Sequence, residues 1–284
     1  MSRLRQGARD DGADPATRIP LALHAPDARH CLLAETEVTV VPTAVARLAY
    51  RLLGPGGTGL RTRLGPDLAL ALLTAAVEQD DDALAGLALE LDVESQRLAA
   101  IAPFLAMPLL LACGRAWASA IPAGWGHGHC PVCAAWPALA ERREGRPRLR
   151  CSRCGAGWSR SGARCPFCEC EDPDQLALLV VGAAALDRSG LHGRNAGRSG
   201  MLERPSAPDR YVEACRRCRG YVKALVTTAP IPPADVAVRD LLTVDLDLAA
   251  LDAGLVRPSV RVPRPNGVPA SGRHARLAAP LAGG

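Results

Sequence analysis

Eight of the eleven cysteines in the chain fall into four C-x-x-C pairs, and this spacing constrains the fold more than any other feature. We call each pair a knuckle. The four knuckles are Cys130 with Cys133, Cys151 with Cys154, Cys165 with Cys168, and Cys215 with Cys218. A C-x-x-C turn directs two thiolates toward one ion, and two such turns complete a tetrahedral site of four sulfur ligands. Eight cysteines therefore predict two metal sites.

The order of the knuckles predicts which of them share an ion. The first two stand as C-x2-C-x17-C-x2-C, the spacing of a zinc ribbon. The first and third knuckles contain proline ("CPVC", "CPFC"), and the second and fourth follow β-prone runs ("RPRLRC", "RYVEAC"). This repeat predicts two tandem modules, with Cys130, Cys133, Cys151 and Cys154 in one and Cys165, Cys168, Cys215 and Cys218 in the other. In the alternative, the middle two knuckles share an ion and the outer two meet across it.

Three cysteines and two histidines stand outside this pattern. In "RCPFCEC" the third cysteine, Cys170, could replace a ligand in a C-x-C arrangement or act as an exposed thiol near the metal, but no fifth thiolate is needed, so a leftover thiol is favoured. Cys31 and Cys113 lie in helical or apolar settings and are interpreted as ordinary buried cysteines. His127 and His129 in "GHGHC" could each replace a thiolate, and a bystander role is favoured because four cysteines are already available.

The metal sites have two interpretations. A structural metal ion can supply folding free energy, an apparent ~10 to 16 kcal/mol for small zinc modules, to a region with little apolar bulk. The ion could instead sense redox state or hold a binding surface. Four thiolates suit iron and zinc alike, so the ligands do not choose the metal. The sequence has no Gly-rich phosphate loop with a lysine, no G-x-S-x-G and no H-E-x-x-H, and we expect a protein that is not an enzyme.

Upstream of the knuckles the sequence predicts helices. Leu, Val and Ala recur at steps of three and four residues, with charges confined to one side, in Thr43–Leu53, Asp67–Gln79 and Asp82–Leu91. The acidic "DDD" at 80–82 can cap the last of these. The uncharged stretch 98–114 is shorter than a usual membrane span and contains Pro103 and Pro108, so we expect a buried helix with a kink or a break.

From the first knuckle onward the sequence has short β-prone pieces, "RPRLR", "LALLVV" and "RYVEA", divided by glycine and cysteine. The segment 234–253 resembles an amphipathic helix, and the Pro-, Gly- and Arg-rich end predicts disorder. The predicted class is α+β: a helical N-terminal domain, two tandem metal modules and a C-terminal helix. The expected divisions are a flexible segment (1–34), a helical domain (35–125), the first module (126–160), the second module with an insertion (161–230), the C-terminal helix (231–257) and a disordered tail (258–284).

The first thirty residues mix both charges and lack an apolar stretch long enough for a secretory signal, which predicts a cytoplasmic protein. In a reducing cytoplasm, eleven cysteines favour metal ligands over disulfides.

Basic residues near the knuckles suggest a nucleic-acid hypothesis. Between Glu141 and Arg164 eight arginines stand against two glutamates. Aromatic residues among basic ones can stack on single-stranded bases, and five lie close to the knuckles: Trp136, Trp158, Phe167, Tyr211 and Tyr221. However, Lys223 is the only lysine in a chain of net charge +5, which indicates codon bias more than phosphate binding. We favour the interpretation that these rings form the small cores of the modules.

The ordered motifs "CPVC", "LRCSRCGAGW", "RCPFC" and "EACRRCRGYVKAL", followed by "ADVAVRDLLTVDLDLAALD", resemble the formate dehydrogenase accessory protein family of the FdhE type. The resemblance covers roughly residues 98–255, and the earlier helices more loosely. Its most specific piece is the last knuckle, which runs into "GYVKAL" and then an acidic-apolar helix.

The resemblance implies a cytoplasmic maturation chaperone for respiratory, molybdenum- or tungsten-dependent formate dehydrogenases, which binds the catalytic subunit before export. It implies two rubredoxin-like modules that hold metal on the eight cysteines of the knuckles, with iron favoured over zinc. It implies no catalytic residue, no small-molecule substrate and no membrane insertion. The alternatives are a zinc-ribbon protein that binds nucleic acid and a rubredoxin-like electron-transfer protein.

Two positions depart from the family pattern. Ala134 and Arg219 stand directly after the first and last knuckles, where the family often has glycine. A residue after a knuckle often has a positive φ, where glycine fits without a steric penalty and other residues are strained. We expect the departure to affect the local geometry and not the ligands.

Overall fold

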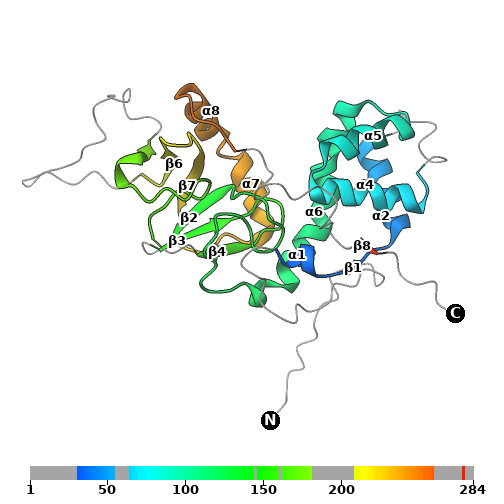
Figure 1. Ribbon diagram of the computed structural model, residues 1–284, viewed down its shortest axis with the longest axis horizontal. Coiled ribbons are helices and arrows are strands. Elements are labelled where there is room, and N and C mark those ends of the chain that lie inside the picture. The colour runs from blue at the N-terminus through cyan, green and yellow to red at the C-terminus, as the bar shows by residue number, and fades with distance from the viewer. Residues whose placement is uncertain are drawn as a thin grey trace, which may run out of the picture. The chain divides into compact units, whose positions relative to one another are not determined.

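The computed structural model describes residues 31–54, 64–143, 146–159, 162–180, 208–258 and 277–278 (Figure 1). These residues belong to two compact units: 36–54, 64–105 and 277–278 to the first, and 31–35 and 106–258, with its gaps, to the second. Helices combine with a mixed β-sheet, which confirms the predicted α+β class. The predicted N-terminal segment (1–34) and tail (258–284) lie almost entirely outside the described residues, and the six-part division stays a prediction.

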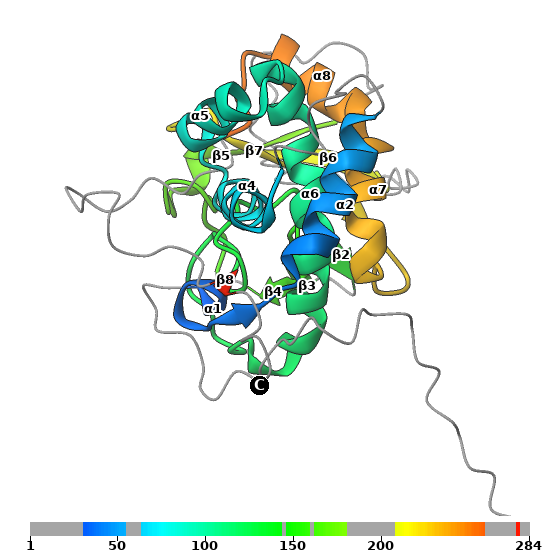
Figure 2. The same ribbon diagram turned by 90° about the vertical axis from the view of Figure 1, so that its right-hand side faces the viewer.

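Three helices of the first unit lie within one residue of their predicted bounds: α2 (Pro42–Leu53), α4 (Pro66–Glu78) and α5 (Asp81–Leu91). Proline stands at the start of α2 and α4, where its missing amide has no helical partner to lose. The Asp80 side chain accepts a hydrogen bond from the Ala83 amide at 3.1 Å and caps α5, as the "DDD" run predicts. Helix α4 packs against both α2 and α5 (Figure 2). The short strands β1 (Val38–Thr39) and β8 (Leu277–Ala278) pair in parallel.

Helix α6 (Ser95–Ala116) is one helix across Pro103 and Pro108, and the expected break is absent. The boundary between the two units falls within it, after Leu105. Leu98 and Leu110 are fully buried on this helix, whereas Phe104 is largely exposed. By length and composition alone α6 could cross a membrane, and 44% of its most apolar stretch is buried. It is weak evidence for a membrane span.

The second unit is built on a six-stranded sheet of order β4-β3-β2-β7-β6-β5. Neighbouring strands are antiparallel, except that β2 and β7 run parallel at the centre. The strands are β2 (Leu139–Arg143), β3 (Arg146–Arg150), β4 (Gly157–Ser159), β5 (Leu176–Leu179), β6 (Arg210–Cys215) and β7 (Tyr221–Val226). Four short helices accompany them: α1 (Leu32–Glu35), η1 (Ala118–Ala120), η2 (Pro173–Gln175) and η3 (Pro233–Asp235).

The sheet repeats one arrangement twice. Each repeat runs knuckle, strand, strand, knuckle, strand, with β2, β3 and β4 in the first and β5, β6 and β7 in the second. Across the sheet, the strands of each repeat lie in reverse chain order, β4-β3-β2 followed by β7-β6-β5. The first strand of the first repeat, β2, therefore pairs with the last strand of the second repeat, β7. The internal repeat predicted from the knuckles is therefore a structural repeat, and its two copies share one continuous sheet.

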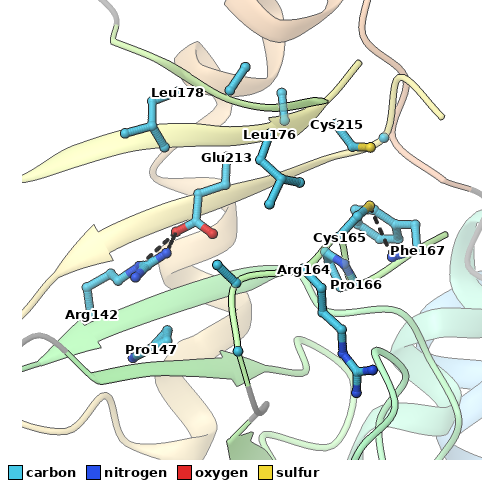
Figure 3. A pocket seen from close by; sticks show the side chains of 15 residues that line it. Arg142, Pro147, Arg164, Cys165, Pro166, Phe167, Leu176, Leu178, Glu213 and Cys215 are labelled. Carbon is cyan, nitrogen blue, oxygen red and sulfur yellow. Dashed lines mark hydrogen bonds and ion pairs between the residues drawn. The ribbon is translucent and has the colours of Figure 1, made fainter. Parts of the chain in front are cut away.

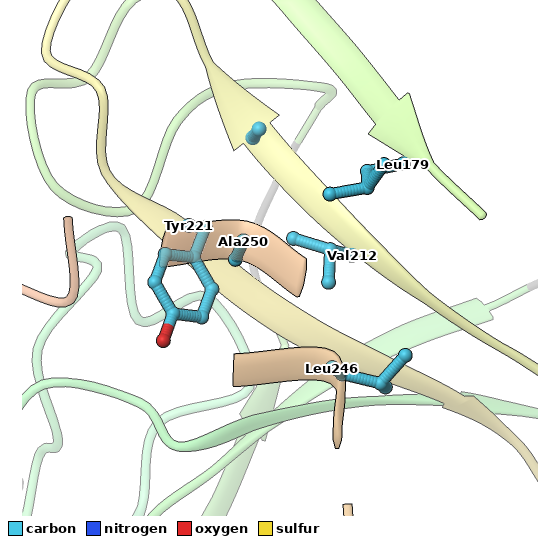
Figure 4. Close-up of a cluster of buried hydrophobic side chains, with 6 residues drawn as sticks. Leu179, Val212, Tyr221, Leu246 and Ala250 are labelled. Carbon is cyan, nitrogen blue, oxygen red and sulfur yellow. The ribbon is translucent and has the colours of Figure 1, made fainter. Parts of the chain in front are cut away.

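One face of the sheet is covered by α7 (Val236–Leu241) and α8 (Val244–Asp252). Leu246 and Ala250 of α8 are fully buried against Leu179 of β5, Val212 of β6 and Tyr221 of β7 (Figure 4). Val236 at the start of α7 packs in a second cluster with Ala138, Leu139 and Ile231. Alternate side chains of β5, β6 and β7 thus face the two helices, as expected for a sheet with one covered face.

The segment 234–253, predicted as one amphipathic helix, contains η3, α7 and α8 instead. The division follows from a contact with the sheet. In a continuous helix the Asp240 carbonyl would accept from the amide four residues later, but here it accepts from Lys223 Nζ at 2.6 Å. The Thr243 hydroxyl donates to the carbonyls of Arg239 and Asp240, which caps α7. A lysine from the sheet therefore helps to end the first helix.

Lys223 is fully buried and is held by two carboxylates. Its Nζ lies 2.6 Å from Asp240 Oδ1 and 2.6 Å from Asp247 Oδ2. The Tyr221 hydroxyl donates to Asp247 at 2.8 Å, and Arg257 pairs with Asp240 at 2.8 Å. A buried charge is tolerated only with such partners, because its desolvation costs several kcal/mol. The network ties β7 to both helices through directional contacts.

We predict that Leu246→Ala lowers the free energy of unfolding by about 2 to 5 kcal/mol, because it removes a fully buried side chain between α8 and the sheet. Urea denaturation followed by circular dichroism measures the change. Leu241→Ala is the matched control, since the Leu241 side chain is 73% exposed and its loss should leave stability almost unchanged. Equal effects of the two substitutions would contradict the packing of α8 described above.

Candidate metal centres

The four knuckles share one backbone geometry. In each, the amide of the first cysteine donates to the carbonyl of the residue five positions later, at distances of 2.8 to 3.0 Å: Cys130 to Ala135, Cys151 to Ala156, Cys165 to Cys170 and Cys215 to Gly220. In the first three knuckles the amide of the residue after the second cysteine donates back to the carbonyl of the first. These bonds close a tight turn in which both thiols point to the same side.

The residue after the second cysteine has a positive φ in all four knuckles. The values are 58° for Ala134, 70° for Gly155, 57° for Glu169 and 60° for Arg219. The expected left-handed conformation is therefore present at Ala134 and Arg219 although neither is glycine, and each carries a steric strain that glycine would avoid. At Arg219 the side chain compensates in part, because its guanidinium donates to the Gly254 carbonyl at 2.7 Å.

The turns bring the eight sulfurs together in two groups of four. In each group the ligand atoms all lie within 4.8 Å of one another, and the groups have the membership that the internal repeat predicts: Cys130, Cys133, Cys151 and Cys154 in the first cluster, and Cys165, Cys168, Cys215 and Cys218 in the second cluster. The alternative, in which the middle two knuckles share an ion, does not match this grouping. That these sulfurs ligate a metal remains our proposal.

The sulfur spacing fits a tetrahedral ion. Across each cluster, the first cysteine of one knuckle lies close to the second cysteine of the other. These Sγ–Sγ distances are 3.4 Å for Cys130–Cys154, 3.6 Å for Cys133–Cys151, 3.6 Å for Cys165–Cys218 and 3.7 Å for Cys168–Cys215. A tetrahedron with metal–sulfur bonds of about 2.3 Å has edges of about 3.8 Å, whereas a disulfide bond measures about 2.05 Å. Each cluster could therefore hold one metal ion, iron or zinc.

Backbone amides point at sulfurs of the second cluster. The Phe167 amide donates to Cys165 Sγ and the Gly220 amide donates to Cys218 Sγ, both at 3.4 Å. Such bonds stabilise thiolates and adjust the potential of sulfur-bound iron. Each donor stands two residues after the cysteine whose sulfur accepts, Phe167 within the third knuckle and Gly220 just after the fourth.

A buried ion pair supports the first cluster. Arg150 directly precedes Cys151, and its Nη1 lies 2.7 Å from Glu141 Oε2. The same guanidinium donates to the carbonyls of Gly155 and Ile231 at 3.2 and 2.6 Å, while Glu141 accepts from the Ile231 amide at 3.0 Å. Because both charged side chains are buried, these contacts fix the second knuckle against the chain that leads to α7.

Cys170 occupies a repeated position that is not a ligand position. Its carbonyl closes the third knuckle, as the carbonyls of Ala135, Ala156 and Gly220 close the others. The equivalent residues have no side chain that could ligate a metal. Cys170 is buried beside Cys165 and Cys215, yet it is outside both four-sulfur groups. The position therefore favours the prediction that Cys170 is a leftover thiol.

The other candidate ligands also lie outside the two clusters. Cys31 and Cys113 are buried, and burial raises the pKa of both thiols to about 12. His127 and His129 stack at 5.1 Å between ring centroids, and Trp125 contacts both edge-on. Burial, and then the neighbouring His127, lowers the pKa of His129 to about 4. Among the described residues, neither histidine joins a metal-ligating group.

Several of the arginines that prompted the nucleic-acid hypothesis are engaged within the protein. Arg142 pairs with Glu213, and Arg148 donates to the Gly157 carbonyl at 2.8 Å. Arg150 is buried in its ion pair, and Arg164 donates to the Gly126 carbonyl. Trp158 and Tyr221 are buried, and the rings of Trp136 and Phe167 meet edge-to-face at 5.4 Å. These contacts support the interpretation of the aromatic side chains as core and leave fewer free cations for phosphate.

A pocket of about 460 Å³ lies beside the second cluster. Figure 3 shows Cys165, Cys215 and Phe167 at one end of it and the ion pair of Arg142 with Glu213 at the other. Its walls come from β2, β5, β6 and the third knuckle, and they are mostly apolar. No signal in the sequence marked this pocket, since its lining residues are far apart along the chain.

Comparisons with known proteins find a likeness among solved structures. No family model matches the chain, and no curated protein matches it. The solved structure of the FdhE protein from Pseudomonas aeruginosa is similar over 86% of this chain and 98% of that chain, with 21% sequence identity and a TM-score of 0.42. Its name is the family name that the ordered motifs suggest. At this level of likeness, the function must be argued from the residues of the chain itself.

We predict that Ala134→Gly raises the free energy of unfolding by about 1 kcal/mol, because glycine has no steric penalty at a φ of 58°. The reverse change, Gly155→Ala, should lower it by more, since the added Cβ would lie 2.5 Å from the Pro233 carbonyl oxygen. Denaturation of the metal-loaded proteins measures both. A loss of stability in Ala134→Gly would contradict the left-handed geometry at this position.

We predict that Cys170→Ser leaves two metal ions per chain, because the position closes the knuckle through its backbone and not through its thiol. Cys165→Ser is the matched control in the same knuckle and should reduce the metal content to one ion. Elemental analysis and the absorption spectrum of anaerobically purified protein measure the number and identity of the ions. One ion in Cys170→Ser would make Cys170 a ligand.

Proposed function

We propose that the chain is a cytoplasmic, non-catalytic maturation factor for a respiratory formate dehydrogenase, and that it binds the catalytic subunit before export. The observation that carries the proposal is that the ordered cysteine motifs, which resemble the FdhE family, bring their sulfurs together as two clusters of four on one repeated sheet. In this proposal all eight cysteines of the knuckles ligate metal, and the family resemblance favours iron.

An exposed apolar surface supports a protein partner. Seven large apolar side chains on and next to α7 and α8 are each about half exposed or more, and we call them the α7–α8 apolar surface: Val238, Leu241, Leu242, Val244, Leu248, Leu251 and Val256. Single exposed apolar residues are common, but a concentration of them marks surfaces that bind other proteins. The opposite side of α8 is occupied by the sheet, so these side chains remain available to a partner.

The metal clusters would hold this surface in place. Helix α7 begins just after Ile231, whose backbone is fixed by Glu141 and Arg150 next to the first cluster. Helix α8 packs on β6 and β7, the strands that flank the fourth knuckle. Metal ions at both clusters therefore stabilise the strands on which the α7–α8 apolar surface is mounted. Their loss should weaken partner binding even though no metal lies at that surface.

We predict that a tagged chain recovers a formate dehydrogenase catalytic subunit from cells grown on formate or nitrate. The double substitution Leu241→Asp, Leu248→Asp should reduce the recovery at least tenfold, because it places two charges on the α7–α8 apolar surface. Quantitative mass spectrometry of the bound proteins measures the effect.

Leu89→Asp is the control, since Leu89 is an exposed leucine of α5 in the first unit and should not affect recovery. Circular dichroism and metal content should be the same in all three proteins. If the unsubstituted chain recovers no formate dehydrogenase subunit, and a deletion strain keeps normal formate dehydrogenase activity, the proposed function is wrong.

A further inference from the structure

The two clusters have the same ligand set but different surroundings. All four cysteines of the first cluster are buried. In the second cluster, Cys165 and Cys215 are buried but Cys168 and Cys218 are partly exposed. The exposed pair takes one cysteine from each knuckle, so half of the ligand set of this cluster is within reach of solvent.

Segments from elsewhere in the second unit cover the first cluster. The amides of Leu32 and Leu33 in α1 donate to the carbonyls of Pro131 and Val132, inside the first knuckle, at 2.9 and 3.0 Å. Helix α6 approaches the second knuckle so closely that a Cβ on Gly114 would lie 2.0 Å from the Cys154 carbonyl oxygen. To open this cluster, the chain would have to give up these contacts together with the buried pair of Glu141 and Arg150.

The second cluster is packed both by its own module and by the first module, which approaches the third knuckle so closely that a Cβ on Gly128 would lie 1.7 Å from the Pro166 carbonyl oxygen. Phe167, Cys170 and Leu176, all from its own module, pack against its cysteines. The pocket of about 460 Å³ reaches Cys165 and Cys215, while Cys168 and Cys218 are partly exposed. A small ligand can thus approach this cluster directly.

We propose that the second cluster is the exchangeable centre of the protein, at which the bound ion is open to thiols and other soft ligands, while the first cluster keeps its ion as a closed structural centre. The inference rests on the metal-binding part of the proposed function. It assigns different roles to two sites that the sequence makes alike.

The exchange is a ligand substitution without electron transfer. With an ion held by the second cluster, an incoming thiol would form a metal–sulfur bond as the bond to Cys168 or Cys218 broke, and the proton of the incoming thiol would pass to the released cysteine thiolate. The charge on the ion does not change. Exposure of the ligand sulfurs controls the rate, because the incoming sulfur must reach the ion before the first bond is fully lost.

The test uses the full chain loaded with zinc and mixed with excess 4-(2-pyridylazo)resorcinol, a coloured chelator. We expect two phases of one zinc equivalent each, with rates that differ at least tenfold. The double variant Cys168→Ser, Cys218→Ser should hold one zinc and lose the fast phase. A single phase of two equivalents, or a double variant that keeps the fast phase, would overturn the proposal.

Cysteine labelling tests the proposal on the unsubstituted chain, whose folding no substitution affects. With N-ethylmaleimide and peptide mass spectrometry, Cys168 and Cys218 should be modified at least tenfold faster than Cys133 and Cys151. Equal rates, or faster modification of the first cluster, would overturn the proposal. If the chain takes up no zinc, both this proposal and the metal-binding part of the proposed function are wrong. If it releases two zinc equivalents in one phase, only the proposal of an exchangeable second cluster is wrong.

Discussion

Parallel pairing of β2 with β7 joins the two cysteine modules into a single sheet, and the organisation of the second unit follows from it. The register places Leu139 opposite Lys223 and Glu141 opposite Leu225. These residues face the α7 and α8 side, where Leu139 packs on Val236 and Lys223 reaches Asp240 and Asp247. Without this pairing each module would be a three-stranded sheet with two open edges, and the helices would have no common surface to cover.

The sequence predicts the local parts of this arrangement and misses the parts that depend on distant contacts. A knuckle is a turn of a few residues, so its geometry is encoded where it stands, and the repeat of "CPVC" and "CPFC" was sufficient to group the eight cysteines. Strand β2 reads "LAERR", which is a poor strand pattern. The buried Glu141 is tolerated in this strand because it forms an ion pair with Arg150 of the next strand. The β2–β7 pairing joins residues more than eighty positions apart, and the spacing of apolar residues along the sequence does not predict it.

The helices illustrate the same division. Apolar periodicity placed α2, α4 and α5 within one residue, because each has its own start signal and its own buried side. The division of the segment 234–253 into α7 and α8 depends on Lys223, a residue of the sheet, which takes the Asp240 carbonyl. A sequence window around α7 does not contain that lysine. Propensity is overridden here by one buried charge that requires oxygen partners.

Two sites with equal ligands need not have equal chemistry, and the difference here lies in the chain around them. Each cluster has two knuckles, four sulfurs and the same cross-cluster pairing of cysteines. What distinguishes them is that all four ligands of the first are buried, with α1 and α6 packed on its knuckles, whereas two of the four ligands of the second are partly exposed. The ligand pattern therefore fixes the number of ions that can bind, and packing that is remote in sequence controls how easily each ion is reached.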